Sequence, residues 1–484
     1  MRIVFVNPRC DIYPPLGLCS LSAYLKEQLP GVETVLVDIP PATGLRAAAA
    51  LITAARPDLI AITTYTVAFS DVVEICGYLK ERSSTIPILL GGPHITSLPG
   101  TLPATADIGV IGEGEATLLE LCHCLSEGKL ADPGSLASIR AICYHGPEGV
   151  VTTSERGSIE PLDSIPPPDL AILNMRWYTA RRMYFTMKGN FKGFVLLTSR
   201  GCPFNCRFCQ ASAQWGRCRY HSAERVVSEL ERLRTLYPKL DAVNIIDDLF
   251  IGDRKRLREI VRLIREKGLH HGMVFNVNGH AMLVDEEVIG LLKSINVVQI
   301  AYGFESGSER VLDFLKKGSV TVERNRRAAA LTSAAGIGVG GQFMIGSPGE
   351  TEEDFRQTVA FIAQTPMSHV HVSATTPMPG TELWEICRGK GLVSDAMDWR
   401  TLDFGNPDTA ALLYCNEECM PYERFNELKS EVKQVADRWN PVPSLIANLS
   451  YWQLYTPTEF VRRVFMGLNR MRHQYVNKIR QKDQ

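Results

Sequence analysis

The chain has 484 residues, of which 45% are hydrophobic and 22% are charged, and its formal net charge is −1. These values are typical of a globular protein, and the balanced charge gives no sign of nucleic acid or a charged surface as the main partner. No run approaches the roughly 18 consecutive apolar residues of a membrane-spanning helix. The length favours about three domains.

The N-terminus and the cysteines together indicate the compartment. The first residues, MRIVFVN, predict a strand and not a signal peptide. The chain contains 13 cysteines. Without a secretory signal, cysteines in a chain of this size are expected to be reduced, as small buried side chains or as cofactor ligands. We therefore expect a cytoplasmic protein without disulfides.

Residues 1–130 alternate short apolar runs with helical stretches. Continuous apolar strands separated by helices predict an α/β domain, a doubly wound parallel sheet covered by helices on both faces. The predicted helices are Leu18–Gln28, Leu45–Ala55 and Val72–Arg82. The predicted strands are Met1–Asn7, Thr34–Asp38, Leu59–Thr63, Ile86–Leu90 and Ile108–Ile111.

Residues 131–192 lack this alternation, and the run Ile165-Pro-Pro-Pro-Asp169 is typical of a linker because proline blocks regular structure. A second series of six strands, each followed by a helical stretch, occupies residues 193–385. Six βα units predict an open, partial (β/α)₆ barrel, since a closed barrel needs eight. Residues 386–484 predict a helical C-terminal domain that ends in an amphipathic basic helix, Pro457–Arg480. The six strands are Phe194–Ser199, Ala242–Asp247, Met273–Asn278, Val297–Phe304, Gly338–Ile345 and His369–Thr375.

Three cysteines follow the first strand of the second series at the spacing C-x₃-C-x₂-C: Cys202, Cys206 and Cys209. Thiolates ligate iron–sulfur clusters, and a four-iron cluster normally takes four of them. Three cysteines in one tight loop would leave one iron open to another ligand. The alternatives are buried core cysteines or a zinc site, but zinc usually takes four ligands and no fourth stands nearby in a zinc pattern.

This segment resembles the radical S-adenosylmethionine (SAM) superfamily in its spacing, in the aromatic Phe208 before the third cysteine and in its position after the first barrel strand. The resemblance implies a [4Fe–4S] cluster held by the three cysteines, with SAM on the open iron. It also implies that segments at the ends of later strands line the SAM pocket. The residues expected there, besides Phe208, are Asp247, Asp248, Gly303, Glu305 and Ser306.

The first domain together with the barrel resembles the cobalamin (B12)-binding subclass of this superfamily, the class B methyltransferases. Four segments carry the resemblance, and all follow predicted strands, where doubly wound sheets bind ligands. The segment after the first strand, Asp11–Gly17, has no histidine that could ligate cobalt. The resemblance therefore implies cobalamin with its own base detached. His94 is expected to pack against the sheet and not to ligate cobalt. The residues expected at the cobalamin site are Pro15, Leu16, Gly17, Thr64, Tyr65, Gly91, Gly92, Gly112, Glu113 and Gly114.

The resemblance implies a radical enzyme that cleaves SAM to a 5′-deoxyadenosyl radical and, with cobalamin, methylates a carbon atom of a small molecule. The alternative is a dehydratase, epimerase or rearrangement enzyme, such as one acting on an aminoglycoside diol, whose cobalamin domain is vestigial. Flavodoxin or ferredoxin would donate the electron. The bias towards arginine and alanine suggests a natural-product pathway such as antibiotic biosynthesis. For methylation, the cysteine loop and the strand ends of the first domain must surround one space, with Glu305 on its barrel wall.

Overall fold

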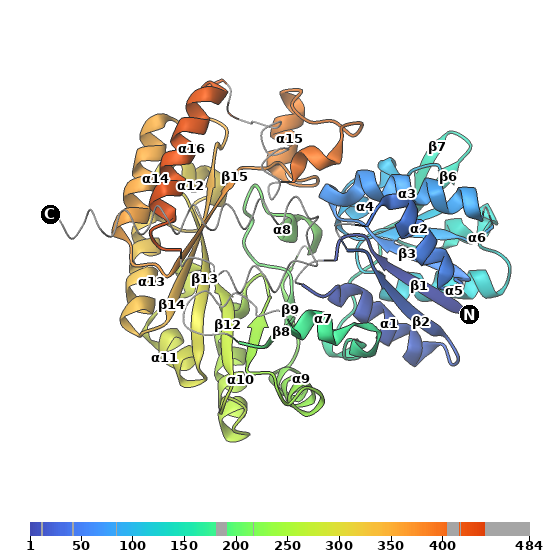
Figure 1. Ribbon diagram of the computed structural model, residues 1–484, viewed down its shortest axis with the longest axis horizontal. Helices are drawn as coiled ribbons and strands as arrows, with labels where there is room; N and C mark the ends of the chain where they lie inside the picture. The colour runs from blue at the N-terminus through green and yellow to red at the C-terminus, as the bar shows by residue number, and fades with distance from the viewer. Residues whose placement is uncertain are drawn as a thin grey trace.

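In the computed structural model, each predicted βα series forms its own sheet, and the two sheets lie in separate lobes (Figure 1). The structure describes residues 1–10, 13–40, 43–83, 85–180, 191–215, 217–403, 416 and 418–440. The predicted terminal helix Pro457–Arg480 lies outside the described residues. Among the described helices, none is long and apolar enough to cross a membrane.

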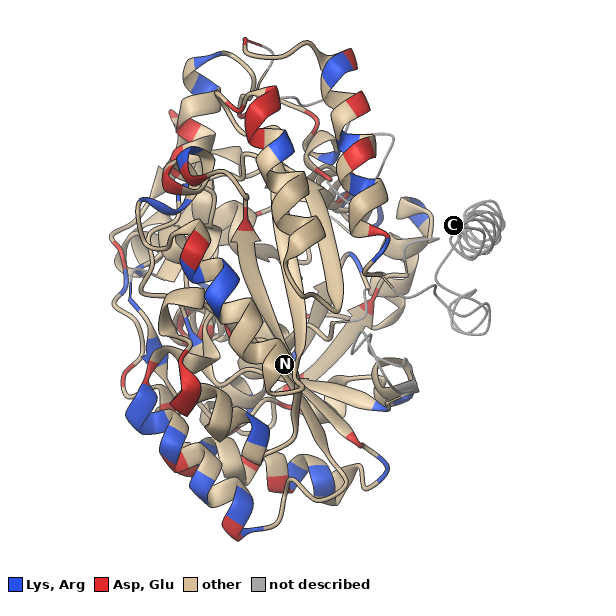
Figure 2. Ribbon diagram, turned by 90° about the vertical axis from the view of Figure 1, so that its left-hand side faces the viewer, with Lys and Arg blue, Asp and Glu red and all other residues tan. Residues whose placement is uncertain are grey.

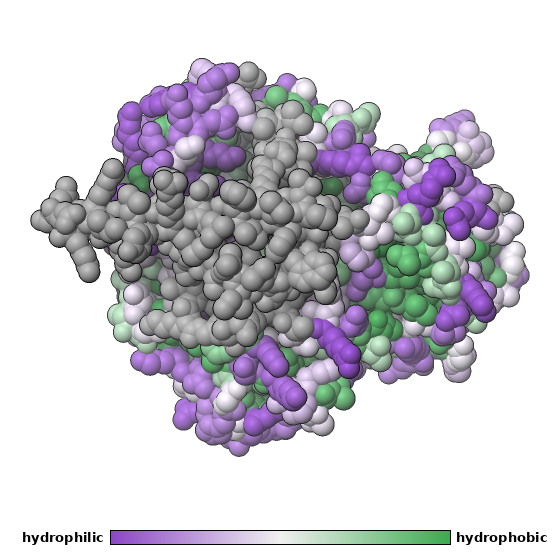
Figure 3. Space-filling view, in the orientation of Figure 1, coloured by the Kyte–Doolittle hydropathy of each residue, from purple (hydrophilic) through white to green (hydrophobic). Residues whose placement is uncertain are grey.

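The first sheet has the strand order β2-β1-β3-β4-β5-β6-β7, and its first five strands are parallel. Its strands are almost wholly apolar because helices cover both faces. Ile3 and Phe5 pack with the α1 and α5 side, whereas Val4 and Val6 pack with α2 and α3. Apolar residues also gather at the surface of this lobe, on the right in Figure 3. The elements are β1 (Arg2–Asn7), α1 (Leu16–Gln28), β2 (Glu33–Asp38), α2 (Leu45–Ala54), β3 (Leu59–Thr63), α3 (Phe69–Arg82), β4 (Ile88–Gly91), α4 (Pro93–Ser97), β5 (Ile108–Val110) and α5 (Glu115–Ser126).

The first sheet extends beyond the predicted boundary at residue 130. An antiparallel hairpin, β6 (Ile142–Gly146) and β7 (Gly149–Thr152), adds two strands next to β5. Gly146 pairs with Gly149, so the turn has two residues, and Gly149 adopts a φ of 126° that favours glycine. The sheet is therefore mostly parallel, and the segment predicted as a linker begins with part of the first domain.

The next described part of the predicted linker, residues 153–180, is tied to both lobes. Asp169 accepts hydrogen bonds from Ser22 (2.7 Å) and Lys26 (2.6 Å) of α1. Asp163 accepts a hydrogen bond from the backbone of Ser222, the residue that caps α9 of the barrel. The segment thus has defined contacts on each side.

The second sheet has the order β15-β14-β13-β12-β11-β8, and all its pairings are parallel. Its edges, β8 and β15, do not pair, which confirms the open six-stranded barrel. Charged residues of both signs lie along the helices that cover it, while the strands are almost free of them (Figure 2). The strands are β8 (Gly193–Leu196), β11 (Ala242–Ile245), β12 (Val274–Gly279), β13 (Val297–Glu305), β14 (Gly338–Ile345) and β15 (His369–Ala374). The main helices are α9 (Ala223–Leu236), α10 (Arg254–Glu266), α11 (Glu286–Ser294), α12 (Glu309–Lys316), α13 (Val322–Ala334) and α14 (Glu352–Gln364).

The described part of the predicted C-terminal domain consists of two separate pieces. Residues 382–403, which we call the strap, contain α15 (Glu382–Gly389) and pack into the core of the first domain. Arg400 of the strap pairs with Asp71 and Glu74 of α3. In contrast, α16 (Tyr422–Ala436) packs on α14 and β15 of the barrel.

Candidate functional site

A cavity of about 410 Å³ lies where the two lobes meet. One wall is formed by the segments after β1, β3, β4 and β5, at the carboxyl ends of the first sheet. Because β2 and β3 lie on opposite sides of β1, the chain changes direction there, and such switch points form ligand crevices in α/β sheets. The barrel supplies the opposite wall, including Leu197, Arg200, Trp215 and Ile246.

Nearly all residues predicted at the cobalamin site line this cavity. They are Pro15, Leu16, Gly17, Tyr65, Gly91, Gly92, Gly112, Glu113 and Gly114. Thr64 does not line it. Its side chain is fully buried, and its hydroxyl donates to the carbonyl of Gly91 (2.8 Å) and accepts from the backbone of Ile95 (3.3 Å). Thr64 therefore joins two neighbouring loops and does not face a ligand.

The cavity wall fits a large flat cofactor. A side chain added at Gly17 or Gly112 would meet no atom within 4 Å, so the backbone at these positions borders open space. Gly112 also has a φ of 72°, which few residues other than glycine adopt. From the described part of the loop that precedes Gly17, Pro14, Pro15 and Leu16 line the cavity. These observations match the shape expected for bound cobalamin.

The carboxylate of Glu113 points to protein partners. Arg200 donates to Glu113 (2.8 Å) and to Glu115 (2.6 Å), and Arg219 also contacts Glu113. Ser20 donates to Glu115 at 3.0 Å. Burial would raise the pKa of Glu113, but the hydrogen bonds and charges of Arg219 and Arg200 outweigh it and lower this pKa. We call Arg200, Arg219, Glu113 and Glu115 the interlobe clamp, because it joins the first domain to the start of the cysteine loop.

His94 packs inside the first domain. Its ring stacks on Phe69 at 3.7 Å and meets Trp399 of the strap edge-on at 4.5 Å, and its Nε2 lies 3.1 Å from the hydroxyl of Thr101. Burial lowers the pKa of His94 to about 3. The imidazole is therefore neutral and structural.

The three cysteines lie on the loop between β9 (Ser199–Arg200) and α8 (Gln210–Trp215). None forms a disulfide, and each is partly exposed. The Cys209 amide donates to the Cys206 carbonyl at 3.2 Å, and Gly201 has a φ of 90° at the entrance of the loop. Burial raises the pKa of Cys202 and of Cys206 to about 11, so binding of iron must displace protons.

Three free thiols on one short loop fit the donor set of a [4Fe–4S] cluster with one open iron. Among the described residues, no three His, Cys, Asp or Glu side chains are grouped as ligands of a single metal ion. Phe208, between the second and third cysteines, packs against the core of the first domain. The cysteine loop is thus in contact with both lobes.

The two predicted aspartates differ in environment. Asp247 is fully buried and accepts hydrogen bonds from the backbone of Thr198 (2.5 Å) and the hydroxyl of Ser199 (2.7 Å), so it supports the start of the cysteine loop. Asp248 is exposed as a residue, although desolvation of its carboxyl, followed by the charge of Asp247, raises its pKa against a backbone hydrogen bond from Gly201. Of the two aspartates, only Asp248 is accessible to a ligand.

The predicted residues at the end of β13 also divide. Glu305 is buried at a φ of 60°, and its carboxylate lies 3.3 Å from the ammonium of Lys316. Gly303 leaves room for this carboxylate to fold back, since an added side chain would overlap it. Ser306 is buried and lies 3.1 Å from the hydroxyl of Thr358, which makes it structural. The charge of Glu305 contributes to the raised pKa of Cys206. Glu305 does not line the cavity between the lobes.

The residues on the barrel side of the cavity were not predicted from the sequence. Arg200 directly precedes Gly201 and Cys202, and this proximity to the motif could have indicated it. Gln214 donates to the carbonyl of Pro93 (3.1 Å) and lines the cavity beside Trp215. Gln214 and Trp215 belong to no motif, so nothing in the sequence indicated these two residues.

A B12-type sheet that opens onto an open barrel with a three-cysteine loop defines a radical enzyme with two cofactor domains. The model of the radical SAM superfamily matches residues 196–362, and that of the B12 binding domain matches residues 3–122. The chain is 31% identical over 392 residues to an uncharacterized methyltransferase of Pyrococcus horikoshii, covering 80% of this chain and 81% of that protein. This chain therefore belongs to the radical SAM superfamily and carries an N-terminal B12-binding domain.

Two further likenesses agree with this assignment. The chain is 28% identical over 370 residues to the cytidylyl-2-hydroxyethylphosphonate methyltransferase of Streptomyces wedmorensis, covering 70% of this chain and 68% of that protein. The fold matches the radical SAM methyltransferase TsrM of Kitasatospora setae with a TM-score of 0.70 at 20% identity, covering 96% and 99% of the two chains. The cofactors of the present 484-residue protein are a [4Fe–4S] cluster, SAM and cobalamin.

Proposed function

We propose that this enzyme methylates a carbon atom of a small molecule, with cobalamin as the methyl carrier and SAM as the methyl source. One observation carries the proposal: the cavity at the strand ends of the first sheet continues to Leu197 and Ile246 at the mouth of the barrel. A methyl carrier and a radical site must share one space, because a short-lived radical reacts only with a partner already positioned beside it. The names of the relatives, several of them methyltransferases, support the same reaction.

When bound, the cluster and SAM supply a 5′-deoxyadenosyl radical, and cobalamin supplies the methyl group. The protein's part is to hold and orient these groups. Cys202, Cys206 and Cys209 would hold the cluster. The glycine-edged wall at Gly17 and Gly112 would let the backbone approach the corrin. The interlobe clamp fixes the start of the cysteine loop against the first domain.

The open cavity favours this function over that of an enzyme with a vestigial cobalamin domain, in which we would expect side chains to occupy the space. We further propose that Asp248 contacts SAM or the substrate, because this residue is exposed and its charge acts on Cys202 of the cysteine loop. A reduced flavodoxin or ferredoxin is the proposed electron donor, and a natural-product intermediate is the proposed substrate.

The test uses anaerobically reconstituted enzyme, cobalamin, a reductant and SAM carrying a deuterated methyl group. Intermediates of the neighbouring pathway serve as candidate substrates. We expect a product whose mass carries the labelled methyl group, formed together with 5′-deoxyadenosine. Cys209→Ala should abolish both, whereas Cys419→Ala, an exposed cysteine outside the loop, should abolish neither. A product without label, formed with 5′-deoxyadenosine by cobalamin-loaded enzyme, would contradict the proposal.

A further inference from the structure

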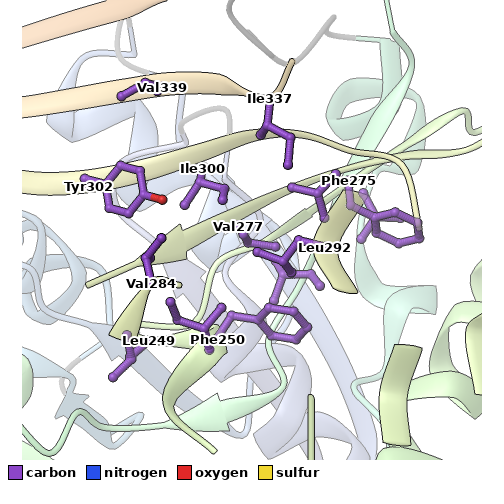
Figure 4. Packing of buried hydrophobic residues seen from close by; sticks show 14 of the residues in the cluster. Leu249, Phe250, Phe275, Val277, Val284, Leu292, Ile300, Tyr302, Ile337 and Val339 are labelled. Atoms are coloured by element: carbon purple, nitrogen blue, oxygen red, sulfur yellow. The ribbon is translucent and has the colours of Figure 1, made fainter. Parts of the chain in front are cut away.

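The barrel sheet has one face packed against helices and one face that points into the open barrel. Phe275, Val277, Ile300 and Tyr302 lie on the helical side, where Leu292 of α11 covers them (Figure 4). Because side chains alternate along a strand, the residues between these positions point to the inner face. In a closed barrel such inner positions are filled by bulky branched side chains that form a packed core.

In this protein the inner positions carry small or polar side chains, apart from Met344, and these side chains are at least partly exposed. Gln342 and His371 are exposed, and the remaining members are partly exposed. Desolvation nevertheless lowers the pKa of His371. We call this set the inner barrel face: Asn276, Asn278, Ala301, Gly303, Gln342, Met344, His371 and Ser373.

The strand register places these residues in rows. Gln342 of β14 stands between Gly303 of β13 and His371 of β15, and Asn278 of β12 stands opposite Ala301. The short side chains of β13 therefore form a floor, with hydrogen-bonding side chains on either side of it. The Oδ1 atom of Asn276 is buried and has no hydrogen-bond partner among the described residues.

Two carboxylates near this face already have partners within the protein. Glu305 pairs with Lys316, and Asp247 is bound by Thr198 and Ser199. Within the described ranges, the inner barrel face contains no arginine or lysine that could bind a phosphate or carboxylate. A phosphate or carboxylate placed here would lose its hydration without gaining an opposite charge. Amide, imidazole and hydroxyl groups instead suit uncharged hydrogen-bonding partners.

We infer that the inner barrel face binds an uncharged substrate portion rich in hydroxyl or amide groups, with Gln342 and His371 as substrate-binding residues. This inference rests on the proposed function and specifies the class of its substrate. Gln342 can both donate and accept through its amide, and neutral His371 can do the same through its two nitrogens. The floor at Ala301 and Gly303 lets the substrate carbon approach the strand ends where the cysteine loop begins.

The substrate class can be tested without knowing the substrate. A small-molecule extract of the source cells is incubated with the reconstituted holoenzyme and deuterated SAM, and products that gain the labelled methyl group are isolated at pH 7. We expect the labelled product to pass through an anion exchanger and to stay in water when shaken with hexane. Retention on the exchanger, or transfer into hexane, would overturn the inference.

The residue assignment is tested with that product's precursor. We expect Gln342→Leu and His371→Leu each to raise KM roughly tenfold, the effect of losing about one hydrogen bond. Iron content, cobalamin absorbance and substrate-free SAM cleavage should stay unchanged. Met344→Leu, an apolar replacement on the same face, should leave KM within about threefold. Unchanged KM in both polar variants would refute the assignment.

The two proposals can fail separately. If the substrate is altered but no label enters it, the methylation proposal fails. The raised KM of Gln342→Leu and the neutral character of the altered substrate would then still support the inner barrel face as its binding surface.

Discussion

Polar residues at the ends of strands could be predicted from sequence, but their roles could not. Thr64, Asp247 and Ser306 follow strands and were predicted to bind cofactors, yet each is buried and hydrogen-bonded to protein. Their partners lie up to 52 residues away, as for Ser306 and Thr358. A sequence pattern specifies the residue at a strand end, whereas the availability of its side chain depends on groups brought in by folding.

Glu350 gives a pH-dependent prediction at the same scale. Its carboxylate accepts the backbone amides of Gly346 (2.5 Å) and Ser347 (2.9 Å), and burial raises its pKa to about 8. An unfolded glutamate has a pKa of about 4.3. The folded state therefore binds the proton more tightly, so ionisation of Glu350 makes the protein less stable as the pH rises from about 4.3 to 8.

We expect Glu350→Gln to remove this contribution, because the amide oxygen can still accept both backbone bonds. Relative to wild type, the variant should gain more than about 1 kcal/mol of unfolding free energy between pH 5 and pH 8. Urea unfolding at the two pH values measures this difference. Glu353→Gln, at an exposed position on α14, serves as the control and should track wild type. An identical pH slope in Glu350→Gln and wild type would contradict the assignment.

At the scale of elements, regular βα units were predictable and irregular ones were not. The predicted strands Leu59–Thr63 and Gly338–Ile345 match β3 and β14 at both ends, since a strand covered by helices is a bounded apolar run. The β6–β7 hairpin was missed because its second strand is partly or fully exposed and carries little apolar signal. The strap was missed because its core contacts lie in the first domain, far away in sequence.

The first turn of α1 gives a prediction about the cofactor cavity. Gly17 lines the cavity, and a side chain there would extend into open space. We expect Gly17→Trp to reduce bound cobalamin at least tenfold, measured by absorbance after gel filtration, while iron content stays unchanged. Gly77→Trp is the matched control: Gly77 lies on α3, has the same open surroundings and does not line the cavity. Equal loss of cobalamin in both variants would refute the placement of the site.

At the scale of the whole molecule, the arrangement of the two lobes could not be read from the sequence. It was expected only as a requirement of methyl transfer. The structure joins the lobes through the interlobe clamp, whose members Glu113 and Arg200 are 87 residues apart. Pairing over such a distance leaves no periodic signal, so Glu113 was predicted as a cobalamin contact and not as the partner of Arg200. The three cysteines and Glu305 do not line the cavity between the lobes, which differs from the arrangement expected for methyl transfer.

The clamp gives a prediction about stability. Arg200→Met should lower the free energy of unfolding by about 3–5 kcal/mol, because it leaves the buried Glu115 carboxylate without a cation. Adding Glu115→Gln should restore part of this loss by removing the uncompensated charge. Chemical denaturation of the apoprotein measures both values. Arg262→Met, at an exposed pair on α10, should cause no measurable change. A double variant no more stable than Arg200→Met would argue against a charge-based clamp.

The strap makes the first domain discontinuous along the chain. The polypeptide leaves that domain after β7, builds all six strands of the barrel sheet, and only then returns to place Trp384, Cys387 and Trp399 in the interior that β1 began. The barrel therefore has the topology of an insertion within the first domain and not of a module appended to it. A fragment that stops at Thr152 would lack part of its own hydrophobic interior, and an exchange of cobalamin domains between relatives would have to carry both ends of this split unit.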